Sequence, residues 1–154
     1  MSKLSNKIKN ELKRHIFEGR CLELFPGEDN DSIKFLHSIT ESKIISIGNN
    51  KLAAPHMKFI LCNVPPYPWF FRKFDYIFLN EAEWLWIEHG LPVKTNLNPD
   101  KALKFIDKYL KFSGKLIISN IHELIAAKIN MLLNHRGNYS FQYNARVAVY
   151  SKIN

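Results

Sequence analysis

The chain has 154 residues, a length typical of a single domain. Apolar residues make up 46% of it, which is enough to build a hydrophobic core and argues against an intrinsically disordered chain. No apolar run approaches the roughly 20 residues that a membrane-spanning helix needs, and the first residues lack the apolar stretch of a signal peptide. We therefore expect a cytoplasmic protein with no membrane association.

The formal net charge is +8, and the first 20 residues, with six basic and two acidic side chains, carry half of this excess. Such a surface favours nucleic acid, acidic ligands or acidic protein partners, although a solvated helix that keeps the protein soluble explains it equally well. The two cysteines, Cys21 and Cys62, fall in expected strands, where we expect reduced, buried thiols.

The expected elements alternate between strands and helices along the chain. Leu4, Ile8, Leu12 and Ile16 recur every four residues, which predicts an amphipathic helix over residues 4–17. Strands are expected at residues 20–25, 43–48, 57–64, 74–80 and 114–120, and residues 139–153 read as one long strand or a hairpin. Further helices are expected at residues 30–39, 80–90, 98–114 and 120–137.

Capping signals support the later helices. Asn98 and Pro99 open the helix that we expect to end before Gly114, and Asn120 with Glu123 forms a capping-box pattern for the helix that follows. Because short apolar strands alternate with helices, the chain favours a mostly parallel sheet with helices on both faces. Residues 1–18 form a basic N-terminal helix in this interpretation, and residues 19–154 form the α/β domain.

Three stretches give the chain a resemblance to class I S-adenosylmethionine-dependent methyltransferases over roughly residues 17–152. "KFDYIFLNEAEW" resembles the family's fourth strand and catalytic loop, and "RVAVYSK" resembles its antiparallel last strand. "ALKFIDKYLKFSGKLIISN" resembles the helix, "L-K-x-G-G" turn and fifth strand, with Ser113 and Gly114 in the glycine positions. The resemblance implies a single Rossmann-like, three-layer α/β domain whose last strand is antiparallel.

The resemblance also implies positions that bind the cofactor S-adenosylmethionine. Glu23 matches the acidic residue of the family's first motif and Gly27 matches its middle glycine, whereas Phe25 and Asp29 stand where the other two glycines would be. Asn49 replaces the acidic residue that holds the ribose, and Asn63 replaces the aspartate near the adenine. Glycines in this motif let the backbone approach the cofactor, so Phe25 is a departure from the pattern.

Candidate catalytic residues follow the strand at residues 74–80. The carboxyl ends of strands are where open α/β sheets bind ligands, and there Asn80 could orient a substrate while Glu81 acts as acid or base. "NVPPYPWFF" resembles the Asn-Pro-Pro-Tyr motif of amino-methyltransferases, interrupted by Val64. Its aromatic and basic side chains are candidate contacts for a substrate or partner, or else they pack on the sheet edge: Tyr67, Trp69, Phe70 and Arg72.

The six histidines show no metal-binding spacing, and no sequence signature of a nucleophilic hydrolase or a phosphate-binding loop occurs, so no metal is expected. Two interpretations therefore stand. The protein is a small methyltransferase that acts on RNA or another anionic substrate, or it is a non-catalytic binding protein on the same scaffold, for example an immunity protein that neutralises a toxin. Fold alone does not choose between them.

Overall fold

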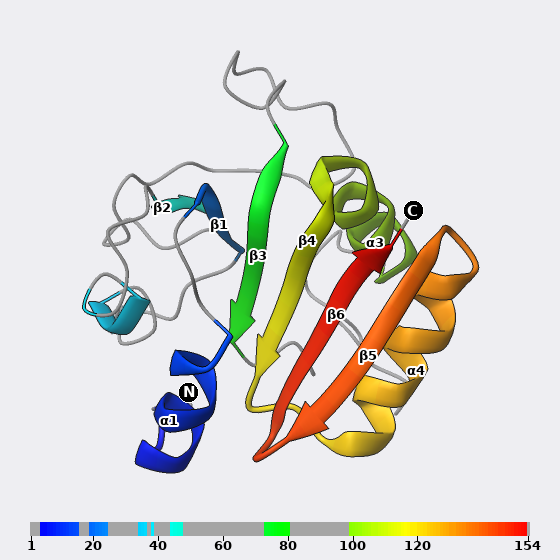
Figure 1. Cartoon of the computed structure of the whole chain (residues 1–154). Coiled ribbons are helices and arrows are strands. Elements are labelled where there is room, and N and C mark those ends of the chain that lie inside the picture. Colours follow the sequence, from blue (N-terminus) through cyan, green and yellow to red (C-terminus); the bar gives the residue numbers. More distant parts are fainter. Residues whose placement is uncertain are drawn as a thin grey trace.

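The structure is a computed structural model that describes residues 4–15, 19–24, 34–36, 38, 44–47, 73–80 and 99–153 (Figure 1). The helices with defined bounds are α1 (Asn6–Lys13), α3 (Pro99–Tyr109) and α4 (Glu123–Asn134). The strands are β1 (Cys21–Leu24), β2 (Ile44–Ile47), β3 (Phe74–Asn80), β4 (Leu110–Ser119), β5 (Asn138–Asn144) and β6 (Val147–Ile153). The strand expected at residues 57–64 and the helix expected at residues 80–90 lie outside the described residues.

The described strands form one mixed sheet in the order β2-β1-β3-β4-β6-β5. The first four strands of this order are mutually parallel, whereas β6 runs antiparallel to both β4 and β5. Strands β5 and β6 therefore form a hairpin, and β6 is the strand of this hairpin that lies beside β4 (Figure 1). The predicted fold, a Rossmann-like α/β domain with a mostly parallel sheet and an antiparallel last strand, is confirmed.

Two hydrophobic clusters cover the two faces of the sheet. On one face, α1 packs through its apolar stripe against Cys21, Tyr76 and Phe78 and against side chains of β4 and β6. On the other face, α3 and α4 pack against Ile77, Leu79 and their neighbours. Since side chains alternate along a strand, the apolar runs of β3 and β4 supply both clusters at once.

Helix α1 is shorter than the sequence pattern predicts, but its buried stripe is the expected one. Leu4, Ile8 and Leu12 are buried. The helix begins after Ser5, whose hydroxyl oxygen accepts a hydrogen bond from the backbone N–H of Ile8 at 3.3 Å, and it ends at Lys13. A serine in this position satisfies one of the N–H groups that the first turn leaves without an intrahelical partner.

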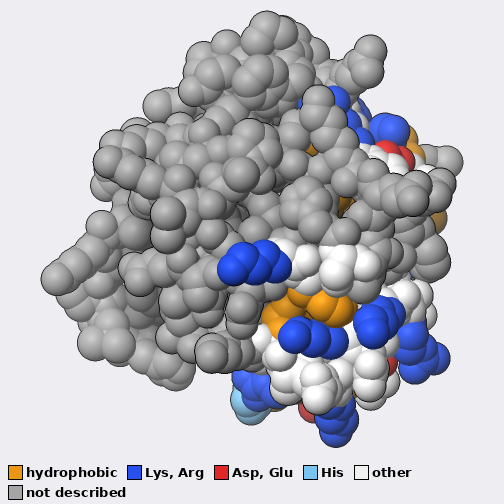
Figure 2. Space-filling view, turned by 90° about the vertical axis from the view of Figure 1, so that its left-hand side faces the viewer, with side chains coloured by type: hydrophobic (Ala, Val, Ile, Leu, Met, Phe, Trp, Pro, Cys, Tyr) orange, Lys and Arg blue, Asp and Glu red, His pale blue; other side chains and the backbone are white. Residues whose placement is uncertain are grey.

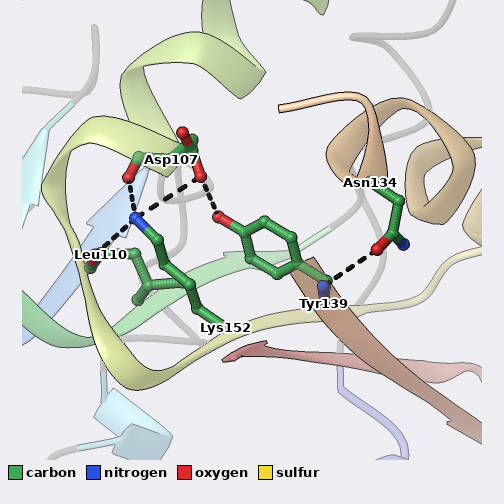
Figure 3. Close-up of polar contacts among 5 residues, drawn as sticks. All are labelled: Asp107, Leu110, Asn134, Tyr139 and Lys152. Carbon is green, nitrogen blue, oxygen red and sulfur yellow. Dashed lines mark hydrogen bonds and ion pairs between the residues drawn. The ribbon is translucent and has the colours of Figure 1, made fainter. Parts of the chain in front are cut away.

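Helix α3 ends earlier than predicted, because strand β4 begins at Leu110 instead of Gly114. Lys152, a nearly buried residue of β6, terminates the helix (Figure 3). Its ammonium group donates hydrogen bonds to the backbone oxygens of Asp107 and Leu110, the latter at 3.1 Å. A cation at a helix C-terminus satisfies carbonyl groups and interacts favourably with the helix dipole.

The same ammonium group takes part in a wider polar network that joins α3, α4, β5 and β6. It lies 3.5 Å from Asp107 Oδ1, and the hydroxyl of Tyr139 donates to that oxygen at 2.6 Å. The backbone N–H of Tyr139 in turn donates to Asn134 Oδ1 at 2.9 Å (Figure 3). Burial, and then the hydrogen bond to Asp107, raise the pKa of Tyr139 above its ordinary value. The network therefore connects the end of α3 to the edge of the sheet.

The turn "LKFSG" of the family resemblance is a bulge in β4. Its register with β3 shifts between Phe74 and Tyr76, so that residues 111–114 have no partner along that strand. Ser113 adopts φ +66°, a left-handed conformation that a glycine adopts without strain. At Gly114, an added Cβ would lie 2.8 Å from the backbone oxygen of Lys111, so this glycine is required by packing.

Asp75, an acidic residue at the start of β3, holds the segment that precedes β1. Its Oδ2 accepts a hydrogen bond from the backbone N–H of Arg20 at 2.8 Å, and its Oδ1 lies 3.3 Å from Lys111 Nζ. Gly19 adopts φ +142°, and a Cβ there would lie 2.8 Å from Asp75 Oδ2. This contact places β1 beside β3.

Helix α4 corrects one predicted cap. The sequence pattern assigns the cap to Asn120, but the helix begins at Glu123 and its N-cap is His122, whose Nδ1 accepts from the N–H of Leu124 at 3.2 Å. Asn120 adopts φ +56° and turns toward Asn80 instead. Among the helices of the described residues, none is long and apolar enough to cross a membrane.

Candidate cofactor and substrate site

The order of the strands reverses at β1. The chain passes from β1 to its neighbour β2 on one side, and later returns to β3 on the other side of β1. In open α/β sheets such a reversal leaves a crevice outside the carboxyl ends of the two strands, and ligands bind there. The described strand ends at this point are those of β1, β2 and β3, and the end of β4 lies beside that of β3.

Glu23 lies on β1, directly between Ser46 of β2 and Phe78 of β3. It is completely buried. Burial first, and the Glu23 carboxylate second, raise the pKa of the buried Cys21 thiol, which therefore stays protonated and serves as a small apolar residue of the core. A carboxylate buried at this point of the sheet must be satisfied by N–H or O–H donors, from the protein or from a bound group.

Asn80, at the end of β3, is held by two residues at the end of β4. Its side-chain oxygen accepts a hydrogen bond from Ser119 Oγ at 2.8 Å and from Asn120 Nδ2 at 3.0 Å. Ser119 and Asn120 are themselves buried. Because the oxygen of the Asn80 amide accepts from both residues, the orientation of this amide is fixed at the end of β3.

Glu23 and Asn80 are the two predicted site residues that the structure describes, and they lie close together. Glu23 pairs with Phe78 in the register of β1 and β3, so Asn80 lies one strand across and two residues further along. Strand geometry makes this a separation of roughly 8 Å between Cα atoms. Their side chains also leave the sheet on the same face, since residues 78 and 80 alternate with 79.

The other predicted site residues lie outside the described residues. These are Phe25, Gly27, Asn49, Asn63, Tyr67, Trp69, Phe70, Arg72 and Glu81. Sequence reasoning missed the contribution of Ser119 and Asn120. The available signal was their position, because both end a strand that the expected order places next to the strand of Asn80.

A second polar group lies near the same end of the sheet and ties α1 to the β5–β6 hairpin. The Glu11 carboxylate accepts from Asn144 Nδ2 at 3.0 Å, and its other oxygen lies 3.0 Å from His15 Nε2. The hairpin turn that follows, Ala145 and Arg146, has φ values of +52° and +62°. The backbone oxygen of Arg146 accepts from the N–H of Ile121, next to Asn120, at 3.2 Å.

Within the described ranges, no group of three or more His, Cys, Asp or Glu residues could hold a metal ion. Fold and residues together define a doubly wound α/β domain with a carboxylate and an oriented amide at the reversal of its strand order. In open α/β sheets, ligands bind at such a reversal of the strand order.

The sequence matches no family model and no curated protein. Solved structures do match. The protein is similar to one from Methanococcus maripaludis that is provisionally assigned as an S-adenosyl-L-methionine-dependent methyltransferase, with a TM-score of 0.68, 13% identity, and 96% of this chain and 84% of that chain covered. It is also similar to the ribosomal protein L11 methylase of Lactobacillus delbrueckii subsp. bulgaricus, with a TM-score of 0.65, 15% identity, and 100% and 81% covered.

A third similar structure is human N-acetylserotonin methyltransferase in complex with S-adenosylmethionine, with a TM-score of 0.65 and 11% identity. There 97% of this chain matches 52% of the human chain. At such low identities the comparisons establish the fold alone. That fold is the one shared by class I S-adenosylmethionine-dependent methyltransferases, as the sequence resemblance predicts.

Proposed function

We propose that the protein binds S-adenosylmethionine at the carboxyl ends of β1, β2 and β3 and methylates an RNA or another anionic substrate. The observation that supports this most strongly is the position of Glu23 and Asn80. They lie on the two adjacent strands at which the strand order reverses, within two residues of each other in register.

The described residues fit an S-adenosylmethionine ligand in their chemistry. The cofactor carries an amino group and ribose hydroxyls, which are donors for a carboxylate such as Glu23, and its carboxylate and ring nitrogens are acceptors for the amide N–H of Asn80. We expect Phe25, Gly27, Asn49 and Asn63 to line the rest of the cofactor site, as the family resemblance implies.

When bound, S-adenosylmethionine supplies a methyl group on a positively charged sulfur, which a substrate lone pair can attack directly. The protein's contribution is then mainly to hold the substrate in line and to exclude water. Asn80, fixed by Ser119 and Asn120, is suited to hold an acceptor atom of the substrate or cofactor in place. Glu81 is our candidate to accept the proton that the substrate loses.

Isothermal titration calorimetry with S-adenosylmethionine and with S-adenosylhomocysteine tests this proposal. We expect binding in the micromolar range and a loss of at least tenfold in Glu23→Gln, which keeps the shape of the side chain and removes its charge. Glu123→Gln, at the exposed start of α4, is the matched control and should bind normally. Each variant must show the far-ultraviolet circular dichroism of the folded protein.

The absence of heat from both ligands in a folded protein would refute the proposal. It would favour the second interpretation, a non-catalytic binding protein such as an immunity protein. That interpretation is supported by the two residues, Phe25 and Asp29, that stand where the cofactor motif has glycine. A pull-down of candidate toxins would then be the next experiment.

A further inference from the structure

We propose that the outer side of α1 and its neighbours form a docking surface for the phosphate backbone of RNA. We define this basic surface as Lys7, Lys9, Lys13, Arg14, Lys34 and Arg146. The inference rests on the proposed function for the choice of RNA, but its evidence is the distribution of charge around α1.

The orientation of α1 places its basic side chains on the outside of the protein. Its apolar stripe is buried against the sheet, so the lysines lie on the remaining faces, with Lys7, Lys13 and Arg14 exposed. Glu11 is the acidic residue of this helix, and its side chain is only 10% exposed. It contacts Asn144 and His15 and forms an ion pair with Arg14 at 3.5 Å, so the outer charge that it offsets is that of Arg14 and not those of the lysines.

Contacts at both flanks extend the basic surface beyond the helix. On one flank, Lys9 Nζ lies 5.7 Å from the centre of the Phe35 ring, and the adjacent Lys34 is exposed. On the other flank, Arg14 lies 3.5 Å from the Glu11 oxygen that Asn144 also contacts. Arg146, exposed in the hairpin turn, follows Asn144 by two residues. Figure 2 shows Lys and Arg side chains gathered on the lower part of this side of the molecule.

The position of this surface relates it to the candidate site. The Arg146 backbone accepts a hydrogen bond from Ile121, and the adjacent Asn120 contacts Asn80. A strand of RNA that follows the basic surface as far as Arg146 would therefore reach the end of β4, next to Asn80. Its phosphates would be held by lysine and arginine while a base reaches the site.

The same observations disfavour a membrane as the partner. A helix that lies on a membrane must expose an apolar face, but the apolar face of α1 is packed into the protein core. The large hydrophobic residues that are exposed in the described part of the chain belong to other segments: Phe112, Leu124, Met131 and Ile153.

Fluorescence anisotropy with a labelled 20-nucleotide single-stranded RNA, without S-adenosylmethionine, tests the proposal. The double variant Lys7→Glu and Lys13→Glu removes two phosphate contacts, each worth about fivefold in affinity at 0.1 M salt. We therefore expect a loss of at least about twentyfold and a salt slope smaller by about 1.4. The matched control, Lys104→Glu with Lys108→Glu on the exposed side of α3, changes the net charge equally and should lose less than about threefold.

Equal losses in both double variants would overturn the proposal, because net charge would then explain binding. Tighter binding of DNA of the same sequence by tenfold or more would overturn the choice of RNA, whereas similar affinities would support contacts to the backbone. Displacement of the RNA by polyglutamate at equal charge concentration would indicate an acidic protein partner instead. Since this assay contains no cofactor and the calorimetry contains no RNA, each proposal can fail without the other.

Discussion

Lys152 is the residue whose removal tests the packing of the sheet most sharply. The substitution Lys152→Met keeps the length and most of the apolar surface of the side chain but removes its ammonium group. The backbone oxygens of Asp107 and Leu110 then lose their donor, and the Asp107 carboxylate loses its buried cation.

The expected cost follows from these three contacts. A buried hydrogen bond to a charged group contributes about 1.5–3 kcal/mol, and the cation at the end of a helix adds about 0.3–1 kcal/mol. The contacts share one ammonium group and are not additive, so we expect a loss of about 3 kcal/mol in the free energy of unfolding. Breaking a buried ion pair by removing one partner has a cost of this size in other proteins, about 3–5 kcal/mol.

Urea denaturation followed by circular dichroism measures this free energy. Lys111→Met is the control. The Lys111 side chain is 48% exposed, and its ion pair with Asp75, like other exposed pairs, contributes only about 0.2–1 kcal/mol. A loss below about 1 kcal/mol in Lys152→Met, or a loss equal to that of the control, would refute the assignment of Lys152 as the cap of α3.

Three further predictions follow from residues of the same domain. In urea denaturation, Ser113→Gly should raise the free energy of unfolding by about 0.5–1 kcal/mol, because glycine adopts the left-handed conformation of this position without strain. Gly114→Ala should lower the free energy of unfolding by more than about 2 kcal/mol, because an added Cβ has no room there. Burial is the chief cause that raises the pKa values of Tyr139 and Tyr150 in the folded protein, so the stability that these neutral tyrosines contribute is complete below pH 10 and declines above it. The urea concentration at the midpoint of unfolding should therefore fall between pH 10 and pH 11. It should fall less steeply in Tyr150→Phe, which has no hydroxyl to ionise at this position. Asn80→Asp replaces the oriented donor by a charged acceptor, so affinity for S-adenosylmethionine in calorimetry should fall at least tenfold, and an unchanged affinity would remove Asn80 from the site.

The local patterns of the sequence predict the strands and the sheet well. Residues 74–80 form β3 with the predicted bounds, and the expected strands at 20–25 and 43–48 contain β1 and β2. Residues 76–79 of β3 are apolar on both faces because α1 packs on one side of the sheet there and α3 and α4 pack on the other, and an unbroken apolar run in the sequence indicates such a strand. The order of elements was therefore sufficient to predict the fold.

Contacts between distant residues account for the errors. Helix α3 ends at Tyr109 because Lys152, which lies more than 40 residues later, caps it, and no local signal announces that contact. Asn120 matches a capping pattern, but its side chain bonds to Asn80 across the sheet. For the candidate site, local motifs proposed Glu23 and Asn80, and their role stays a prediction, whereas the contacts of Ser119 and Asn120 with Asn80 became recognisable only when β3 and β4 were side by side.

The position of β6 between β4 and β5 has a consequence for how the chain assembles. Strand β5 precedes β6 in the sequence but reaches the rest of the sheet only through it (Figure 1). A nascent chain that has just emerged from the ribosome as far as Asn144 would thus hold β4 with an open edge and β5 without its partner. Completion of the sheet must await the synthesis of Val147–Ile153, and until then the exposed edge of β4 is the surface on which two nascent chains could pair wrongly.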